Sequence, residues 1–242
     1  AVLDPVIAIR GALVLAPDES AHVHLVTGVA TTRAAAVTLI EKYRDRHAAL
    51  RVLALSWTHS HVLLRQLAIT EAESQVYEQL AGHLMFGNPT LRAPRSVIAR
   101  NRAGQSSLWA YGISGDLPIA IVRIGELRNL ELVRQLIKAH AYWRLKGLAA
   151  DLVILNEDPS GYRQSVQDEI MTAIATLTDA GLLDRPGGVF VRRSDQLSEQ
   201  DKVLLQTAAR LIVVDAAGSL GDQLARRSYP EVSRALLSSA EG

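Results

Sequence analysis

Four short apolar runs in the second half of the chain constrain its fold more than any other feature. The runs are apolar almost without interruption, as in strands that are buried on both faces of a sheet. Segments with helical periodicity separate them, and such strand–helix repetition implies parallel pairing through right-handed crossovers. The runs occupy residues 118–124, 151–155, 189–191 and 211–214. We therefore predict a small, mostly parallel α/β domain, with a ferredoxin-like α+β arrangement as the alternative topology.

Apolar residues at helical spacing predict the remaining elements. Within the α/β domain we expect helices at 129–146, 165–180 and 198–209. Before this domain, three amphipathic patterns predict helices at 33–44, 48–67 and 70–86. Thr70 with Glu73 three residues later is the signature of a capping box at the start of the third helix. A short helix is expected after Pro94.

The first thirty residues have β character. Val6 to Leu15 and His22 to Val29 are strand-like, with a turn cluster at 16–20 between them, so we predict a β-hairpin. A two-stranded hairpin is marginal alone in water. We expect its strands either to extend a sheet whose other strands lie upstream or to pack on the following helices. Because the sequence opens at Ala1 within the strand pattern, we interpret it as a piece of a longer polypeptide.

Composition excludes several classes of function. A formal net charge of +1 creates no field that would recruit nucleic acid or an anionic membrane. Aromatic residues make up 5% of the chain, which argues against a platform that stacks single-stranded bases. The chain has no cysteine, so a disulfide scaffold, a thiolate nucleophile and a cysteine zinc site are excluded. No window is apolar for long enough to span a bilayer.

The stretch at 100–124 joins the two halves and combines glycine, aromatic and acidic residues. Gly112 and Ser114 suggest a nucleophile elbow, but Asp116 stands where the last glycine is needed and a strand follows, so we reject a serine hydrolase. Trp109 and Tyr111 are interpreted mainly as packing anchors, with a sugar-stacking platform as the alternative. Asp116 is expected to be a structural hydrogen-bond centre. Its candidate partners in a bidentate ion pair are Arg100, Arg102 and Arg123.

A second candidate site follows the strand at 151–155. Asn156, Glu157 and Asp158 lie at the carboxyl end of a predicted central strand, where open α/β sheets bind ligands. They could hold a hard cation or a sugar hydroxyl, but we favour the interpretation that they build the loop and cap the next helix. Glu157 and Asp116 could also act as the acid and base of a glycosidase, a hypothesis that depends on their separation. Neither phosphate-binding glycine motif follows any strand, and we predict no catalytic residue, no metal site and no cofactor.

Several runs of this sequence resemble a segment of bacterial cyclic β-1,2-glucan synthases, with related sequence in β-1,2-oligoglucan phosphorylases. The most distinctive runs are YGISGDLPI at 111–119, YWRLKGL at 142–148, DLVILNE at 151–157 and DRPGGVFV at 184–191. Shorter runs lie at 4–6, 15–17, 26–30, 41–45, 100–102, 104–106, 108–109 and 139–140. The resemblance therefore covers essentially the whole chain.

The resemblance implies a place in a multidomain enzyme. In that family a membrane-embedded module extends β-1,2-glucan from UDP-glucose, a middle module cyclises it, and a carboxy-terminal phosphorylase-like module adjusts its length. This segment would lie between β-sandwich modules of the carboxy-terminal half. The expected domains are the end of an upstream sandwich at 1–30, a helical linker at 31–99, the α/β domain at 100–225 and a tail at 226–242.

The sequence thus predicts a non-catalytic linker or scaffold module of a cyclic β-1,2-glucan synthase-like glycosyltransferase. Its expected partners are neighbouring modules of the same polypeptide and, as a further option, β-1,2-glucan, without nucleic acid or direct membrane contact. We expect a cytoplasmic segment of a parent anchored in the bacterial inner membrane. One alternative is a β-1,2-glucan-binding module that uses Trp109 and Tyr111. The other is a free-standing α/β enzyme with its site at Asn156–Asp158.

Overall fold

A computed structural model describes residues 8–158, 165–178 and 180–225 of the chain. These residues fall into two compact units that divide between His59 and Ser60. The division lies inside helix α2 (Arg46–Gln66). Each unit is described by itself below.

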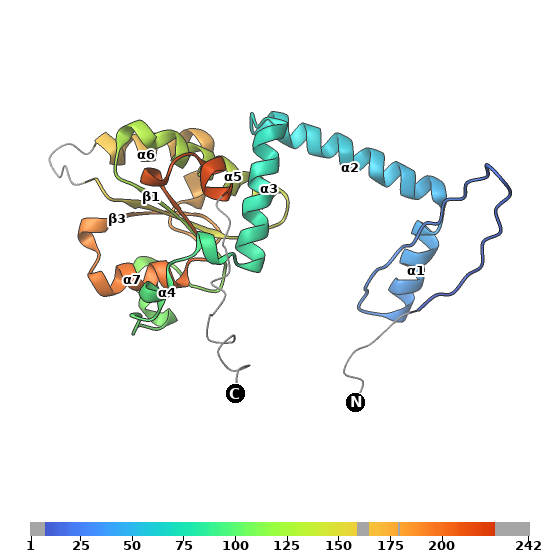
Figure 1. Cartoon of the computed structure of the whole chain (residues 1–242), viewed down its shortest axis with the longest axis horizontal. Coiled ribbons are helices and arrows are strands. Elements are labelled where there is room, and N and C mark those ends of the chain that lie inside the picture. Colours follow the sequence, from blue (N-terminus) through green and yellow to red (C-terminus); the bar gives the residue numbers. More distant parts are fainter. Residues whose placement is uncertain (1–7, 159–164, 179, 226–242) are drawn as a thin grey trace, which may run out of the picture. The chain divides into compact units, whose positions relative to one another are not determined.

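The first unit contains an extended segment and helix α1 (Arg33–Tyr43), whose first turn is capped by the Thr32 side chain. The structure assigns no strand to residues 8–30. Two extended lengths flank a turn at which Glu19 N–H donates to the Ala16 carbonyl and Asp18 adopts a φ of 63° (Figure 1). The predicted β-hairpin is therefore wrong for these residues, while residues 1–7 lie outside the described ranges. A two-stranded ribbon alone is marginal, and no other described strand pairs with this segment.

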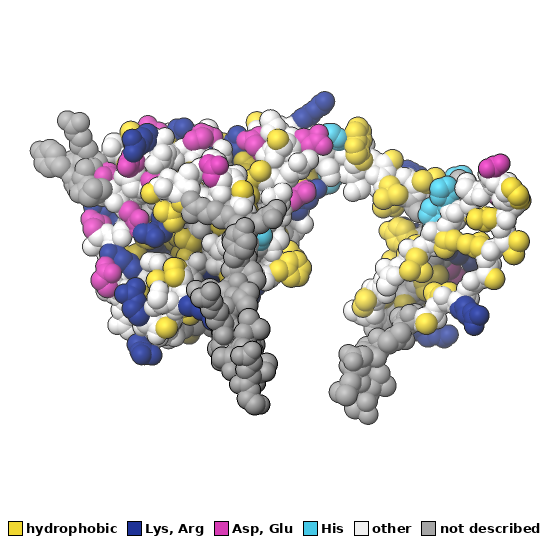
Figure 2. Space-filling model, viewed as in Figure 1, with side chains coloured by type: hydrophobic (Ala, Val, Ile, Leu, Met, Phe, Trp, Pro, Cys, Tyr) yellow, Lys and Arg dark blue, Asp and Glu magenta, His cyan; other side chains and the backbone are white. Residues whose placement is uncertain are grey.

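Hydrophobic side chains cover much of the surface of the first unit (Figure 2). An apolar hollow lies between the extended lengths and α1, lined by residues such as Leu13, Leu25 and Ile40. The Leu25 side chain is 76% exposed. This surface is large and unpartnered within its unit, as is typical of an interaction surface.

The second unit is built on a four-stranded parallel sheet, which confirms the predicted α/β class. The strands are β1 (Ile119–Ile124), β2 (Asp151–Asn156), β3 (Val189–Arg193) and β4 (Leu211–Val214). Their order is β3-β2-β1-β4, and all neighbouring pairs are parallel. The ferredoxin-like alternative is wrong, because that arrangement needs antiparallel neighbours.

Helices cover both faces of this sheet (Figure 1). One core contains Ala120 and Val122 of β1, and the other contains Ile119 and Ile121, since successive strand residues point to opposite faces. The first core is covered by α3 (Glu71–Phe86), α5 (Leu130–Leu145), α6 (Ser165–Leu177) and α8 (Leu220–Ala225). The second core is covered by the 3₁₀ helix η2 (Gln105–Tyr111) and by α7 (Glu199–Ala208), against which α4 (Arg95–Ile98) packs. Short 3₁₀ turns occur at η1 (Pro89–Leu91), η3 (Leu127–Asn129), η4 (Ala180–Leu182), η5 (Ser194–Gln196) and η6 (Asp215–Ala217).

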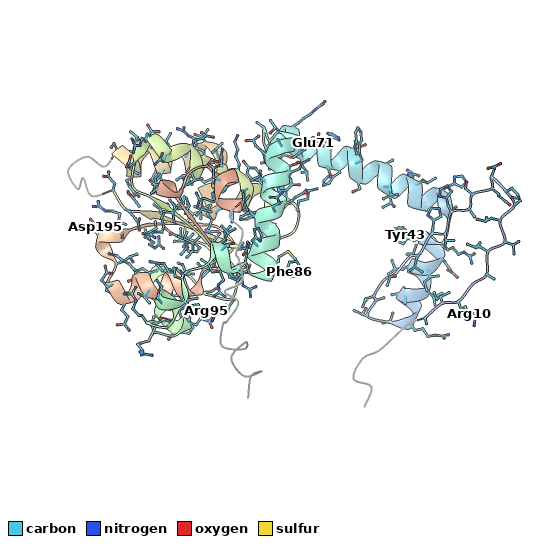
Figure 3. All side chains as sticks on the ribbon, viewed as in Figure 1. Arg10, Tyr43, Glu71, Phe86, Arg95 and Asp195 are labelled. Carbon is cyan, nitrogen blue, oxygen red and sulfur yellow. The ribbon has the colours of Figure 1, made fainter. Side chains whose placement is uncertain are left out.

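Helix α3 is an integral part of the second unit. Its predicted capping box is confirmed, since Thr70 and Glu73 exchange both hydrogen bonds, and Glu71 and Phe86 mark its ends in Figure 3. The buried Trp143 of α5 donates its indole N–H to the Tyr77 carbonyl of α3 at 2.8 Å. Burying an indole while satisfying its donor in this way ties the two helices together.

Candidate functional site

The strand order places the classical ligand crevice of an open α/β sheet between β1 and β4. The chain moves from β1 to β2 to β3 in one direction, and then crosses back to put β4 on the other side of β1. Ligands of such sheets bind beyond the carboxyl ends of the strands at the point where the direction reverses. In this chain the two segments that leave β1 and β4 start with Gly125 and Asp215.

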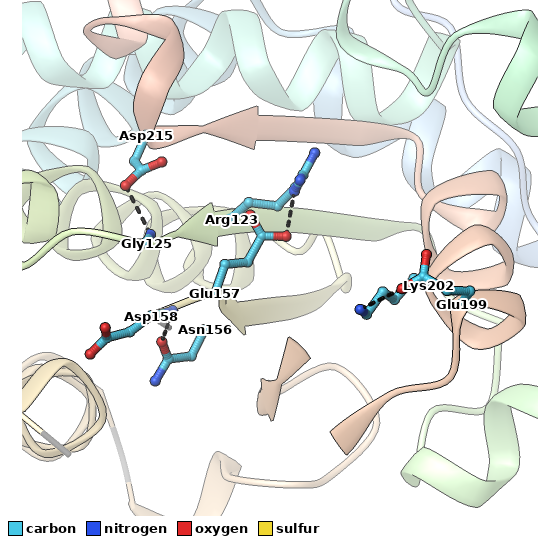
Figure 4. A network of polar contacts seen from close by, with 8 residues as sticks. All are labelled: Arg123, Gly125, Asn156, Glu157, Asp158, Glu199, Lys202 and Asp215. Carbon is cyan, nitrogen blue, oxygen red and sulfur yellow. Dashed lines mark hydrogen bonds and ion pairs between the residues drawn. The ribbon is translucent and has the colours of Figure 1, made fainter. Parts of the chain in front are cut away.

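An internal carboxylate occupies that crevice (Figure 4). Asp215 Oδ2 accepts hydrogen bonds from the backbone N–H groups of Gly125 at 2.9 Å and Glu126 at 3.2 Å, and from Asn129 Nδ2 at 3.3 Å. These donors precede α5, where a bound anion would find unsatisfied N–H groups. Because Asp215 already accepts from them, the crevice is organised as a structural link between β1 and β4.

Glu157, a predicted site residue, is held by an arginine. Arg123 Nε lies 2.8 Å from Glu157 Oε1 (Figure 4). Both side chains are partly buried, with exposed fractions of 31% for Arg123 and 26% for Glu157. The expectation that Arg123 pairs with Asp116 is therefore wrong. The parallel register places Arg123 opposite Leu155, two residues before Glu157, and brings the two charges together at the carboxyl edge.

Asn156 and Asp158 form a compact loop after β2. Asn156 Oδ1 accepts from the Asp158 backbone N–H at 3.0 Å, and Asn156 Nδ2 donates to Gln167 Oε1 at 3.1 Å. The first contact is an Asx turn, and the second ties the loop to α6. The three residues are thus neighbours at one edge, and the hydrogen bonds of Asn156 and the ion pair of Glu157 are made within the chain.

Asp116 and Glu157 lie at opposite edges of the sheet. Asp116 precedes β1, whereas Glu157 follows β2 and sits beside the end of β1. The length of β1 separates them, which is roughly 20 Å for six residues at a strand rise of about 3.3 Å. Glycosidase carboxyl pairs are about 5–10 Å apart. The hypothesis that these two residues form an acid and base pair is therefore wrong.

The amino edge of the sheet presents the other predicted site residues. Trp109 is 64% exposed, so it does not pack in a core of the described residues, whereas packing of Trp109 against another domain stays a prediction. The 3₁₀ helix η2 turns Leu108 inward and Trp109 outward, and it ends at Gly112 with a φ of 72°. Tyr111 is half-buried against the second core. Tyr142 and Trp143 of α5 are both buried.

Hydrogen bonds hold Trp109 next to Asp116. Trp109 Nε1 and Gln105 Nε2 both donate to the Ser114 carbonyl, at 3.2 and 2.9 Å. Gln105 Nε2 also lies 3.0 Å from Asp116 Oδ1, and the Asp116 backbone N–H donates to Ser114 Oγ at 3.2 Å. Asp116 is thus one member of a small polar cluster. No arginine forms an ion pair with it among the residues that the structure describes.

A hollow of about 640 Å³ adjoins this cluster, and we call it the amino-edge hollow. Polar side chains from five residues line it: Asn101, Gln105, Asp116, Thr207 and Arg210. Apolar residues, including Leu108 and Pro118, form the rest of its lining. Its volume lies in the range that is typical of ligand sites.

Two buried titratable groups lie near the same edge and were not singled out from the sequence. His140 donates from Nε2 to the Ala150 carbonyl at 2.9 Å, and Asp151 Oδ1 accepts from the Gly187 N–H at 2.7 Å. Burial lowers the pKa of His140, and the neighbouring Arg144 lowers it further. Burial raises the pKa of Asp151, and the charge of Asp116 adds to this, against the hydrogen bond from Gly187. In the sequence, the helical spacing of His140 from Leu136 and Ile137 puts it on the apolar face of α5, and this spacing is the signal of its burial.

The described ranges contain neither a metal-binding cluster nor a membrane-spanning helix. No three His, Asp or Glu side chains gather there in a way that could hold a metal ion. Within the same ranges, no helix combines the length and the apolar character needed to cross a bilayer.

Comparison with known proteins agrees with the resemblance in the sequence motifs. Residues 1–46 match the family model of the glycosyl hydrolase 94 supersandwich domain. The cyclic β-(1,2)-glucan synthase NdvB of Rhizobium meliloti (strain 1021) is 31% identical over 225 residues, which are 93% of this chain and 8% of that protein. This chain is therefore similar to one segment of a cyclic β-(1,2)-glucan synthase and spans less than a tenth of its length.

Proposed function

We propose that this chain is a non-catalytic linker and scaffold module of a cyclic β-1,2-glucan synthase-like glycosyltransferase, which makes cyclic β-1,2-glucan from UDP-glucose. The main support is the similarity to such a synthase along 93% of the chain. Its partners are the neighbouring modules of the same polypeptide. The segment lies in the cytoplasm without touching the membrane, and its parent is anchored in the bacterial inner membrane.

The internal use of the carboxyl edge supports a scaffold role for the second unit. In enzymes of this architecture the crevice beyond β1 and β4 receives substrate or cofactor. Here Asp215 links the two strands, Arg123 neutralises Glu157, and Asn156 closes the loop that contains Glu157. The groups that would act on a substrate are the groups that hold the edge together.

The apolar surface of the first unit supports a role in joining modules. Residues 8–30 form two extended lengths joined by a turn, and the structure pairs neither length in a described sheet. They also fall within the match to the supersandwich domain. We propose that they add strands to a β-sandwich in the parent protein, which would cover side chains such as Leu13 and Leu25 and pair their backbone groups.

A turnover assay on the whole chain tests the non-catalytic part. Residues 1–242 are incubated with UDP-glucose, and separately with linear β-1,2-glucan and inorganic phosphate. We expect neither release of UDP nor formation of glucose 1-phosphate above the rate of a blank. Turnover that disappears in Glu157→Gln would overturn the proposal and favour an α/β enzyme with its site at the carboxyl edge.

A further inference from the structure

We propose that the amino-edge hollow, together with the Trp109 indole beside it, binds a linear β-1,2-linked glucan. Trp109 would be the stacking surface, and Gln105 and Asp116, which line the hollow, would be hydrogen-bonding groups. This inference rests on the proposed function only for the choice of glucan linkage. The rest depends on the geometry of the amino edge. The site is separate from the carboxyl edge discussed above.

Trp109 is exposed and fixed at the same time. Its side chain is 64% exposed, yet its Nε1 donates to the Ser114 carbonyl at 3.2 Å. An exposed indole without a polar anchor would exchange between rotamers and lose that freedom on binding. Because the Trp109 indole is anchored at its edge, a flat apolar face is already presented for contact with the C–H face of a sugar ring.

The polar groups beside Trp109 suit hydroxyl groups. Gln105 lines the hollow and shares the Ser114 carbonyl with Trp109, so the indole edge lies next to the Gln105 carboxamide. Asp116 Oδ1 accepts from Gln105, while its exposed carboxylate retains further acceptor sites toward the hollow. Both hydrogens of Gln105 Nε2 are used on Ser114 and Asp116, so the Gln105 carboxamide and the Asp116 carboxylate offer acceptors to a sugar. Arg210, which also lines the hollow, offers the donors that vicinal hydroxyls require as well.

The charge balance of the hollow favours a neutral ligand. Arg210 lines the wall together with Asp116, so one positive and one negative side chain face the same space. One guanidinium N–H of Arg210 donates a hydrogen bond to the Met85 carbonyl at 2.9 Å. A phosphate or carboxylate ligand would meet Asp116 as a like charge, whereas an uncharged polyhydroxyl chain meets donors and acceptors of both kinds.

The test is a titration of the whole chain with linear β-1,2-linked glucooligosaccharides, followed by calorimetry and tryptophan fluorescence. The chain has three tryptophans, and one of them, Trp143, is only 1% exposed and so out of reach of a sugar. Contact of a sugar with Trp109 should therefore produce a clear change in the tryptophan fluorescence. We expect saturable binding that Trp109→Ala weakens at least about tenfold. Asp116→Ala should weaken binding several-fold, because it removes an acceptor.

Trp57→Ala is the matched control. Trp57 is exposed to nearly the same extent, 67%, but belongs to the other compact unit. We expect this variant to bind as the wild type does, and circular dichroism should show that both variants remain folded. Equal binding by Trp109→Ala and the wild type would overturn the proposal.

Three further outcomes would also overturn it. One is that the wild type shows no change in heat or fluorescence up to about 10 mM sugar, a concentration at which even a dissociation constant in the millimolar range would be detected. Another is equal affinity for a β-1,4-linked glucan of the same length, which would reject the choice of linkage. The third is binding that falls steeply as salt rises from about 0.05 to 0.5 M, or competition by inorganic phosphate, as expected for an anion on Arg210. If the chain neither bound glucan nor turned over UDP-glucose, the proposed glucan site would be wrong, but the proposed scaffold function would still stand.

Discussion

Asp215 Oδ2 accepts a hydrogen bond from the backbone N–H of Gly125 at 2.9 Å, so the residue after β4 caps the segment that leaves β1. This contact joins two strands that are distant in sequence and adjacent in the sheet. The position that binds ligands in related architectures is thereby used to stabilise the fold.

Asp215→Ala should destabilise the second unit by about 1–2 kcal/mol, because it leaves the Gly125 and Glu126 N–H groups without their acceptor. Urea unfolding followed by circular dichroism measures the effect. Glu126→Gln is the control, since Glu126 pairs with Arg128 at the surface, and its effect should stay within about 0.5 kcal/mol. If both variants lost the same free energy of unfolding, the hydrogen bonds of Asp215 would contribute no more stability than the surface ion pair of Glu126.

Arg123 and Glu157 should be energetically coupled. A double-mutant cycle with Arg123→Gln and Glu157→Gln is expected to give a coupling free energy of about 0.5–1 kcal/mol, reduced by salt because both side chains are partly exposed. The pair Lys202–Glu199, also drawn in Figure 4, is the matched comparison, since Glu199 is 86% exposed and its coupling should be about 0.3 kcal/mol or less. A coupling near zero for Arg123 and Glu157 would contradict the structural role assigned to Glu157.

Protonation of His140 should destabilise the fold. Since burial lowers the pKa of His140, the unfolded chain binds its proton first as the pH falls. The free energy of unfolding contributed by this residue is complete above the unfolded value near 6.5 and decreases below it. In urea unfolding at about pH 7.5, 6.5 and 5.5, the wild type should lose stability more steeply than His140→Gln.

Asp151 should show the opposite dependence. Its raised pKa means that the folded chain holds the proton more tightly, so its contribution is complete below the unfolded value near 3.8 and is lost as the pH rises through the folded pKa. Asp151→Asn keeps an acceptor for the Gly187 N–H without the charge, and should therefore make stability fall more steeply on acidification than in the wild type. An unchanged pH profile in both variants would contradict the burial of these two groups.

Trp143→Phe should cost about 2–3 kcal/mol in urea unfolding, because it removes buried volume and leaves the Tyr77 carbonyl without its donor. Trp109→Phe is the exposed counterpart and should cost less than about 1 kcal/mol. If the two substitutions were equally mild, α3 would not be docked on α5 as described.

The strands of the second unit could be predicted because their apolar runs are short, continuous and separated by helical patterns. The strand predicted at 151–155, for example, agrees to within one residue with β2 (Asp151–Asn156). The hairpin prediction failed for residues 8–30 because strand-like composition does not supply pairing partners, and pairing is a property of the whole sheet.

The candidate sites depended on relationships that no local pattern contains. The partners of Arg123 and Asp215 follow from strand order and register, which place Glu157 and Gly125 beside them. The exposure of Trp109 follows from the direction of a 3₁₀ turn that buries Leu108. Aromatic residues are buried more often than exposed, and so the sequence favoured packing.

The proposed function is that of a module that supports a glucan synthase without performing its chemistry. The most direct measurement is cyclic β-1,2-glucan production by the Rhizobium meliloti synthase after its matching segment is replaced by this chain. We predict that the chimera makes cyclic glucan, that Glu157→Gln within the replaced segment leaves production unchanged, and that a flexible linker of equal length abolishes it. Loss of production in Glu157→Gln at unchanged protein level, or normal production with the flexible linker, would contradict the proposed scaffold function.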